Sequence, residues 1–314
     1  MLRKLYYLLA LSRERHFGRA AEKCRIAQPT LSNAIRQLEE ELGAPLVERG
    51  QRFIDLTPEG EKVLEFARRM TSDFEALTSA IRPGDGALSG RLRLAAIPTA
   101  LPMVAHLVAA FARRHPNVHV ILTSSSSQAI ERDLQTFELD AGVTYLDNEP
   151  LSGVTMQPLY SERYFLLARR RPEWEGRTEI GWAETAALPL CLLTSDMQNR
   201  RIADSSFKMA GKTVTPAIET NSIINLFTLV RYGPWSSIVP GQLLALLPPG
   251  EDLMVLPLAR PAVTYVVGIV YADRSPPTAA AKALAGVAAR DKLADRIAAL
   301  TQEALARHGV GLER

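Results

Sequence analysis

Cysteine is scarce in this sequence, and long apolar runs are missing from it. The two cysteines, Cys24 and Cys191, lie far apart in 314 residues and belong to no paired-cysteine motif, so we expect reduced thiols and a cytoplasmic location. No apolar stretch approaches the roughly 20 residues that span a bilayer. The short apolar run after Met1 lacks a small-residue cleavage site, so neither a membrane partner nor secretion is predicted.

The motifs of common catalytic and metal sites are also missing. No Gly-x-Ser-x-Gly elbow occurs, and Gly211-Lys212-Thr213 lacks the first glycine of a P-loop, with Ser206 in its place. His115 and His119 are four residues apart, but Pro116 keeps them off one helical face. The sequence therefore predicts no enzyme, no metal and no bound cofactor.

The start of the chain carries a local excess of positive charge. The whole chain has a formal net charge of only +3, which excludes global attraction as the source of affinity for nucleic acid. Residues 1–36 hold eight Lys or Arg against two Glu, a local charge of +6. This basic segment suits a nucleic-acid partner, although solvated charges on an ordinary three-helix core would look the same.

The pattern of this basic segment favours a helix-turn-helix. An apolar stripe over residues 2–9 predicts a first helix, and small residues over 17–24 predict a second that packs closely. A third helix is predicted from Pro29 to Gly43, because proline suits a first helical position and glycine a helix end. Its packed face is predicted to be formed by Leu31, Ile35, Leu38 and Leu42.

A β-hairpin wing is predicted after the third helix. Two short runs of alternating apolar residues, 44–49 and 52–56, flank Gly50-Gln51. Short hydroxyl and amide side chains at a helix start, with a longer arginine, can reach base edges or phosphates in a major groove. The residues predicted to contact DNA are Gln28, Pro29, Thr30, Ser32, Asn33, Arg36, Arg49 and Arg52.

These segments together resemble the DNA-binding domain of LysR-type transcriptional regulators. The resemblance rests on residues 17–21, 28–32, 38–43, 46–49 and 56–60, and the length and later pattern of the chain agree with it. It implies a dimer or tetramer on interrupted palindromic sites in double-stranded promoter DNA. It also implies a small-molecule effector and RNA polymerase as a further partner.

A long helix is predicted to follow the wing. Thr57 can cap a helix whose first residue is Pro58. Apolar residues then recur at spacings of four and three, as in a coiled-coil seam, although such a stripe could instead pack on its own domain. In the family that the chain resembles, this helix pairs subunits. The predicted dimerisation residues are Val63, Ala67, Met70, Phe74, Leu77 and Ile81.

Strands alternate with helices from Leu88 onward, which predicts a parallel sheet with helices on both faces. By the resemblance, this half forms two α/β lobes similar to periplasmic solute-binding proteins. The predicted fold is therefore α/β with an all-α winged helix-turn-helix N-terminal domain. The predicted domains are the winged helix-turn-helix at 1–58, a linker and dimerisation helix at 58–90, a first lobe at 91–161 and 268–305, and a second lobe at 162–267.

The resemblance places an effector between the two lobes. Ligands in open α/β sheets gather at the carboxyl ends of strands, and anions favour helix N-termini. Hydroxyl and amide side chains at such ends also cap helices for structural reasons. The predicted effector-binding residues are Thr99, Ala100, Ser125, Ser126, Thr144, Ser195 and Asn221.

A small anionic metabolite is the expected effector, and its identity is not legible in the sequence. The peroxide-sensing branch of the family places a sensing cysteine around residues 196–200, where this chain has none, and Cys191 lies in an apolar strand. Residues 145–151 and 196–201 resemble regulators found beside formate-dehydrogenase operons. Two alternatives stay open: a ligand-independent repressor, and a solute-binding module without DNA function.

Overall fold

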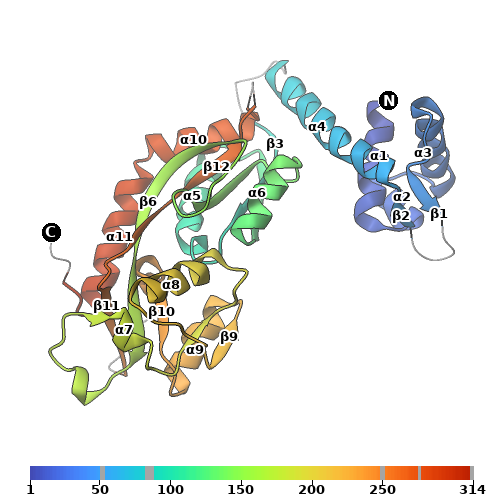
Figure 1. The fold of residues 1–314 in the computed structure, drawn as a ribbon. Helices are drawn as coiled ribbons and strands as arrows, with labels where there is room; N and C mark the ends of the chain where they lie inside the picture. The colour runs from blue at the N-terminus through green and yellow to red at the C-terminus, as the bar shows by residue number, and fades with distance from the viewer. Residues whose placement is uncertain (50–53, 82–87, 248–251, 275–276, 312–314) are drawn as a thin grey trace. The chain divides into compact units, whose positions relative to one another are not determined.

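A computed structural model describes residues 1–49, 54–81, 88–247, 252–274 and 277–311. The chain forms two compact units, residues 1–88 with 135–138 and residues 89–134 with 139–314. Figure 1 shows that the first unit is mainly helical and the second is built around a sheet. In the described part of the chain, no helix is long and apolar enough to cross a membrane.

The first unit has three short helices, a small hairpin and one long helix. These elements are α1 (Leu2–Glu14), α2 (Phe17–Cys24), α3 (Gln28–Leu42), β1 (Val47–Arg49), β2 (Ile54–Leu56) and α4 (Pro58–Ile81). β1 and β2 pair antiparallel, with Val47 opposite Leu56, which confirms the predicted wing. The tip of the hairpin lies outside the described residues.

Apolar side chains from α1, α2 and α3 form the core of this unit. Leu8, Leu31, Ile35 and Leu38 are completely buried in it, as the helical spacing predicted. Leu42 was also expected on this face but is 42% exposed. It is the last residue of α3, where Gly43 adopts a left-handed conformation with a φ of 70° and ends the helix.

The second unit contains a mixed sheet with helices packed against it. Its strands are β3 (Gly90–Ala96), β4 (Val118–Ser124), β5 (Ala141–Tyr145), β6 (Val154–Arg169), β7 (Ile180–Gly181), β8 (Cys191–Leu193), β9 (Ile218–Thr220), β10 (Ser237–Pro240), β11 (Leu253–Ala259) and β12 (Thr264–Ala272). Its α-helices are α5 (Leu101–Arg114), α6 (Ser127–Gln135), α7 (Trp182–Thr185), α8 (Gln198–Met209), α9 (Ile223–Tyr232), α10 (Ala279–Arg290) and α11 (Leu293–Arg307). Two short 3-10 helices are η1 (Pro172–Trp174) and η2 (Gly241–Leu246).

The main sheet has the order β4-β3-β5-β12-β6-β11-β7, and β10 also pairs with β6. β3 pairs in parallel with β4 and with β5, but β6 and β12 pair antiparallel with each other. The parallel pairing predicted from the alternation of strands and helices is present in the first lobe, and the antiparallel pairs involve the strands that connect the lobes. β6 carries the chain from the first lobe into the second and β12 brings it back, so these neighbours run in opposite directions.

The C-terminal helices contact both lobes. α10 packs against α5 of the first lobe. Ala304, Leu305 and Val310 instead lie in a core with Phe165 and Leu243 of the second lobe. The sequence assigned 268–305 to the first lobe, and the structure corrects this for the last residues of α11.

Candidate DNA-binding surface and effector cleft

The outer face of α3 carries the residues predicted to contact DNA. Gln28, Pro29, Thr30, Asn33 and Arg36 are exposed, and Ser32 is half-buried. The inner face of the same helix is consumed by the core, because Leu31, Ile35 and Leu38 have no exposed surface. The polar side chains that are predicted to enter the major groove of DNA therefore all lie on one face of α3. The side chain of Arg49, and Arg52 as a whole, lie outside the described residues.

Hydrogen bonds from α3 and Thr57 hold the base of the wing. Glu39 Oε1 accepts from the backbone N–H groups of Leu46 and Val47, at 2.9 and 3.2 Å. Thr57 Oγ1 donates to the Pro45 carbonyl at 2.7 Å and accepts from the Gly60 N–H at 2.9 Å. The last bond is the predicted cap of α4. The wing is thus tied to α3 on one side and to the start of α4 on the other.

The apolar residues of α4 divide into two groups. Ala67 is completely buried and Val63 packs on the core of the first unit, so these two predicted dimerisation residues serve the chain's own core. Phe66, Met70, Phe74 and Leu77 are 65%, 47%, 44% and 55% exposed. They recur at spacings of four, four and three, which places them on one helical stripe. The side chain of Ile81 lies outside the described residues.

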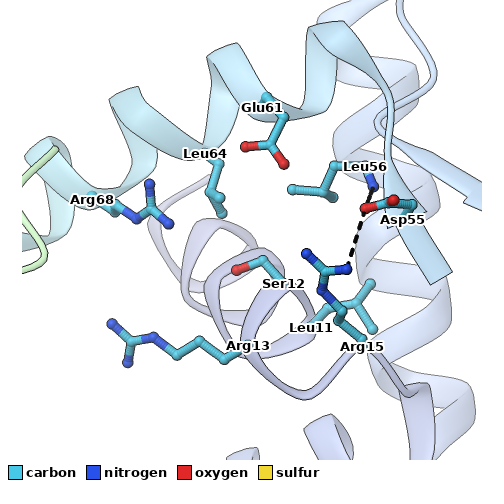
Figure 2. Close-up of a pocket in the computed structure, with 9 residues that line it drawn as sticks. All are labelled: Leu11, Ser12, Arg13, Arg15, Asp55, Leu56, Glu61, Leu64 and Arg68. Atoms are coloured by element: carbon cyan, nitrogen blue, oxygen red, sulfur yellow. Dashed lines mark hydrogen bonds and ion pairs between the residues drawn. The ribbon is translucent and has the colours of Figure 1, made fainter. Parts of the chain in front are cut away.

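A hollow of about 140 Å³ lies where α1, β2 and α4 meet. Figure 2 shows three arginine side chains around it, together with Asp55 and Glu61. Arg15 Nη1 lies 4.0 Å from Asp55 Oδ1. Because acidic and basic groups share the lining, the hollow does not have the single sign of charge that a phosphate site needs.

A second, much smaller cavity lies between the two lobes of the second unit. Its volume is about 10 Å³, which is room for about one water molecule. Strand ends and helix starts from both lobes enclose it. The lining residues are Ile97, Pro98, Thr99, Ser126, Ser127, Tyr145, Leu193, Met197, Gln198 and Asn199.

Two polar groups at this cavity are buried without a hydrogen-bond partner of good geometry. They are the hydroxyl of Thr99 and the amide nitrogen of Gln198, in side chains that belong to residues only 1% and 3% exposed. A buried polar atom without a partner is costly and is normally satisfied by a protein group, a water or a ligand. The cavity therefore offers hydrogen-bonding capacity that the chain itself does not use.

Hydrogen bonds across the cleft hold the lobes together around this cavity. Asn199 Nδ2 in the second lobe donates to Tyr145 Oη in the first at 3.3 Å. Arg201 Nε and Nη2 donate to the Glu149 carboxylate at 2.6 and 2.8 Å, and Nη2 also lies 3.2 Å from Ser127 Oγ. A ligand larger than the cavity can enter only if these bonds open.

A buried carboxyl group lies behind the cavity. Glu162 on β6 has no exposed surface, and it accepts hydrogen bonds from Tyr145 Oη at 2.7 Å and Tyr160 Oη at 3.3 Å. Tyr164 Oη lies 3.1 Å from Tyr145 Oη. Burial raises the pKa of Glu162 from 4.5 to about 7, and the two phenol hydrogen bonds only partly oppose this.

The cavity contains some predicted effector residues and misses others. Thr99 and Ser126 line it. Ala100 and Thr144 are buried nearby without lining it, and Ser195 and Asn221 are exposed. The backbone N–H of Ser125 donates a hydrogen bond to the Ala96 carbonyl.

Sequence reasoning missed Tyr145, Gln198 and Asn199 as cavity residues. Gln198 and Asn199 open α8 after β8, so the strand-end rule that selected Thr99 applies to them too. Ser195, the residue predicted from the sequence, lies in the loop before α8, whereas Gln198 and Asn199 line the cavity from the start of the helix itself. Tyr145 gave no signal, because a tyrosine at the end of a strand is ordinary core.

Neither cysteine lies at the cavity. Cys191 is buried in β8, and its burial raises the pKa of the thiol to about 11. Burial also raises the pKa of Cys24, which packs on the core of the first unit. Both thiols are therefore protonated near neutral pH and poorly nucleophilic. Among the described residues, no group of three or more His, Cys, Asp or Glu side chains could hold a metal ion.

A winged helix-turn-helix joined to a two-lobed α/β unit is typical of a class of DNA-binding proteins. Comparison with known families agrees for both parts. Residues 2–61 match the bacterial regulatory helix-turn-helix of the lysR family, and residues 85–292 match the LysR substrate binding domain. The chain belongs to the LysR family of transcriptional regulators, which are not enzymes.

Individual relatives cover most of the chain. It is 28% identical over 276 residues to the DNA-binding transcriptional dual regulator OxyR of Escherichia coli, covering 88% of this chain and 90% of that protein. It is 33% identical over 250 residues to an SDS degradation transcriptional activation protein of a Pseudomonas species, covering 78% and 80%. Full-length OxyR from Pseudomonas aeruginosa has a similar structure, with a TM-score of 0.76 and 27% identity over 92% of this chain and 94% of that one.

Proposed function

We propose that this LysR-family protein regulates promoters by placing α3 in the major groove of an interrupted palindromic site, as a dimer or tetramer that responds to a small anionic effector. The exposed polar face of α3 on a basic unit supports the DNA contact. The exposed stripe of Phe66, Met70, Phe74 and Leu77 supports pairing through α4. A protein with this role acts in the cytoplasm, where it meets promoter DNA and RNA polymerase.

The cavity between the lobes is the observation that carries the effector proposal. It is enclosed by both lobes and has unused hydrogen-bonding capacity at Thr99 and Gln198. The first turns of α6 and α8 also line it, and backbone N–H groups at helix starts favour negative charge. The cavity of about 10 Å³ holds about one water molecule, so the cleft must open slightly for even the smallest carboxylate. Formate is therefore the first compound to test.

Peroxide sensing through a thiol is not proposed for this chain, although its relatives include OxyR proteins. Such sensing needs a reactive thiolate, which is a low-pKa group in an accessible place. Cys191 is buried in a strand, and its pKa is raised to about 11. Reversible binding of a small molecule at the cavity is therefore proposed in place of thiol oxidation.

Binding to the DNA upstream of the protein's own gene tests this proposal. The purified protein and labelled duplex are titrated at fixed salt, with and without formate, acetate and other small carboxylates. We expect specific binding whose affinity or footprint changes with one compound, because an effector must prefer one state of the oligomer to shift it. Specific binding that no compound changes would favour a ligand-independent repressor. Absence of specific binding under all conditions would favour a solute-binding module.

A further inference from the structure

Glu162 is connected to the cavity through Tyr145. The carboxyl group is fully buried on β6, one of the two strands that run between the lobes. Tyr145 Oη donates to it at 2.7 Å and accepts from Asn199 Nδ2 at 3.3 Å. Tyr145 and Asn199 both line the cavity. A change in the protonation of Glu162 therefore alters the hydrogen bonding of Tyr145, which lines the cavity.

Among the described residues, those that hydrogen-bond to Glu162 or lie opposite it in the sheet are polar and carry no positive charge. Its hydrogen bonds come from phenols on β5 and β6, and Tyr265 lies opposite it on β12. Tyr265 packs edge-on against Tyr145 and Tyr164. Burial, and then the negative charge of Asp147, raise the pKa of Tyr265. From α8, the Asn199 amide donates a hydrogen bond to Tyr145 Oη and not to Glu162 itself. The phenol and amide groups of this cluster are Tyr145, Tyr160, Tyr164, Tyr265 and Asn199.

The cavity also has no cation of its own to balance an anion. The ten residues that line it are all uncharged. Arg200 lies next to the lining but is engaged by Asp204, Glu219 and the Leu193 carbonyl. Arg201 is engaged by Glu149. Because an unbalanced buried charge is costly, an anion in this cavity and an ionised Glu162 behind it would disfavour each other.

We infer that Glu162 is the positioning residue that lets this cleft accept a small anion, such as a short carboxylate, by taking up one proton from solvent as the anion binds. This inference rests on the proposed effector site. Only the Glu162 carboxylate gains a proton, and no other covalent bond is made or broken. The pair of anion and proton enters with no net change in charge.

The hydrogen bonds explain how protonation of Glu162 changes the surroundings of a ligand in the cavity. An ionised Glu162 can only accept, so the Tyr145 hydroxyl proton is committed to it. A protonated Glu162 can donate to the Tyr145 oxygen instead. The Tyr145 hydroxyl proton is then free to turn toward the cavity, where the Gln198 amide nitrogen lacks a partner and the Thr99 hydroxyl interacts with Tyr145. Protonation thus removes a negative charge and supplies a hydrogen-bond donor in one step.

Calorimetric titration of the full chain with sodium formate, sodium acetate and sodium pyruvate tests the inference. Affinity is measured from about pH 6 to about pH 8.5, in two buffers of different ionisation enthalpy, so that proton uptake is read directly. Wild type is compared with Glu162→Gln, whose amide imitates the protonated acid, and with Glu175→Gln, an exposed position in the second lobe. A ¹³C NMR titration of the Glu carboxyl groups in the ligand-free protein gives a readout that needs no ligand.

We expect wild-type affinity for the anion that binds to fall about tenfold per pH unit above neutrality, with uptake of close to one proton. Glu162→Gln should bind without this pH dependence, and Glu175→Gln should follow wild type. A carboxyl signal that titrates near neutral pH should be present in wild type and missing from Glu162→Gln.

Two results would overturn the inference. Anion binding by wild type with no proton uptake and a flat pH profile would leave the effector site standing and remove the role of Glu162. The absence of a carboxyl group that titrates near neutrality would do the same. If none of the three anions binds at any pH, the proposed effector class itself fails, and the inference fails with it.

Discussion

At the scale of single residues, Arg36 offers a direct test of the DNA-binding face. It is exposed on α3, on the same side as Thr30 and Asn33, where a long cationic side chain reaches a base edge or phosphate. We expect Arg36→Ala to weaken binding to the specific promoter site by roughly tenfold or more, because one good contact of this kind contributes about 1–3 kcal/mol. Anisotropy titrations at fixed salt measure the change.

Arg3→Ala is the matched control for this test. Arg3 is also exposed in the first unit, but on α1, and its loss removes the same charge. If both variants lose affinity equally, Arg36 acts only through general electrostatics. Equal melting temperatures of the variants and wild type would show that the fold is intact.

Glu162 also predicts how stability changes with pH. Its pKa is about 7 in the folded chain and 4.5 as the ordinary value, so the folded state holds the extra proton between these pH values. The stability that this provides is fully present below pH 4.5 and is lost as pH rises through about 7. We expect the melting temperature of wild type to fall relative to that of Glu162→Gln from about pH 5 to about pH 8.

The difference between the two proteins isolates this carboxyl group, because all other titrations are common to both. Its full size is on the order of a few kcal/mol, since each pKa unit is about 1.4 kcal/mol. Glu175→Gln should follow wild type at every pH. If the melting temperatures of wild type and Glu162→Gln change in parallel with pH, the pKa of the Glu162 carboxyl is not raised in the folded chain.

At the scale of elements, the close approach of α4 to the base of the wing depends on Gly60. A Cβ atom at this position would lie 2.1 Å from the Leu46 backbone oxygen, a contact that no side-chain movement can relieve. We therefore expect Gly60→Ala to displace the wing or to destabilise the first unit by about 1–3 kcal/mol. Thermal unfolding and promoter affinity measure the two effects.

Gly286 supplies the control for this substitution. It lies within α10, and a Cβ there would meet only the far end of Arg290 at 3.9 Å, so Gly286→Ala should be neutral or slightly stabilising. If Gly60→Ala behaves in the same way, the Leu46 backbone is able to move and the wing is not fixed by this contact.

The elements show where sequence reasoning succeeds and where it stops. The wing and the start of α4 were predictable because local chemistry decides them: alternating residues for the hairpin, and Thr57 with Pro58 for the cap. The order and register of the strands in the sheet were not, because alternation of strands and helices does not reveal which strands pair. For the same reason, only two of the ten residues that line the cavity, Thr99 and Ser126, were among the predicted effector residues. Tyr145 and Asn199 meet only through the tertiary fold.

The stripe on α4 marks a similar limit. Heptad spacing selected Val63 and Ala67, which the first unit buries in its own core, and omitted Phe66. In α4, one group of apolar side chains packs on the core of the first unit and another is exposed. Spacing alone shows that apolar faces exist, but not which surface covers each one.

At the scale of the whole molecule, regulation requires that effector binding and DNA binding share one equilibrium. A ligand shifts this equilibrium only by the difference of its affinities for the two states. By thermodynamic linkage, promoter DNA must change the affinity for the effector by the same factor. Titration of the effector with and without promoter DNA therefore measures the coupling independently of any transcription assay.

Pairing through α4 is the prediction on which a two-half-site protein depends. Phe66, Met70, Phe74 and Leu77 expose large apolar side chains in a row on one helix, and such a patch on a single chain commonly marks an interface. We expect the double variant Phe74→Glu, Leu77→Glu to lose the oligomer seen for wild type, because two buried carboxylates would be costly at the pairing surface. Light scattering after gel filtration measures the mass.

The control and the second readout separate pairing from folding. Glu65→Ala changes an exposed polar residue of the same helix and should leave the mass unchanged. The charged double variant should keep its helical circular dichroism, since Phe74 and Leu77 lie outside the core of the first unit. It should bind a single half-site as well as wild type does and lose the gain that wild type shows on the full palindrome, because linked binding sites gain from effective concentration. Retention of full oligomer mass by the folded variant would place the pairing surface elsewhere in the chain.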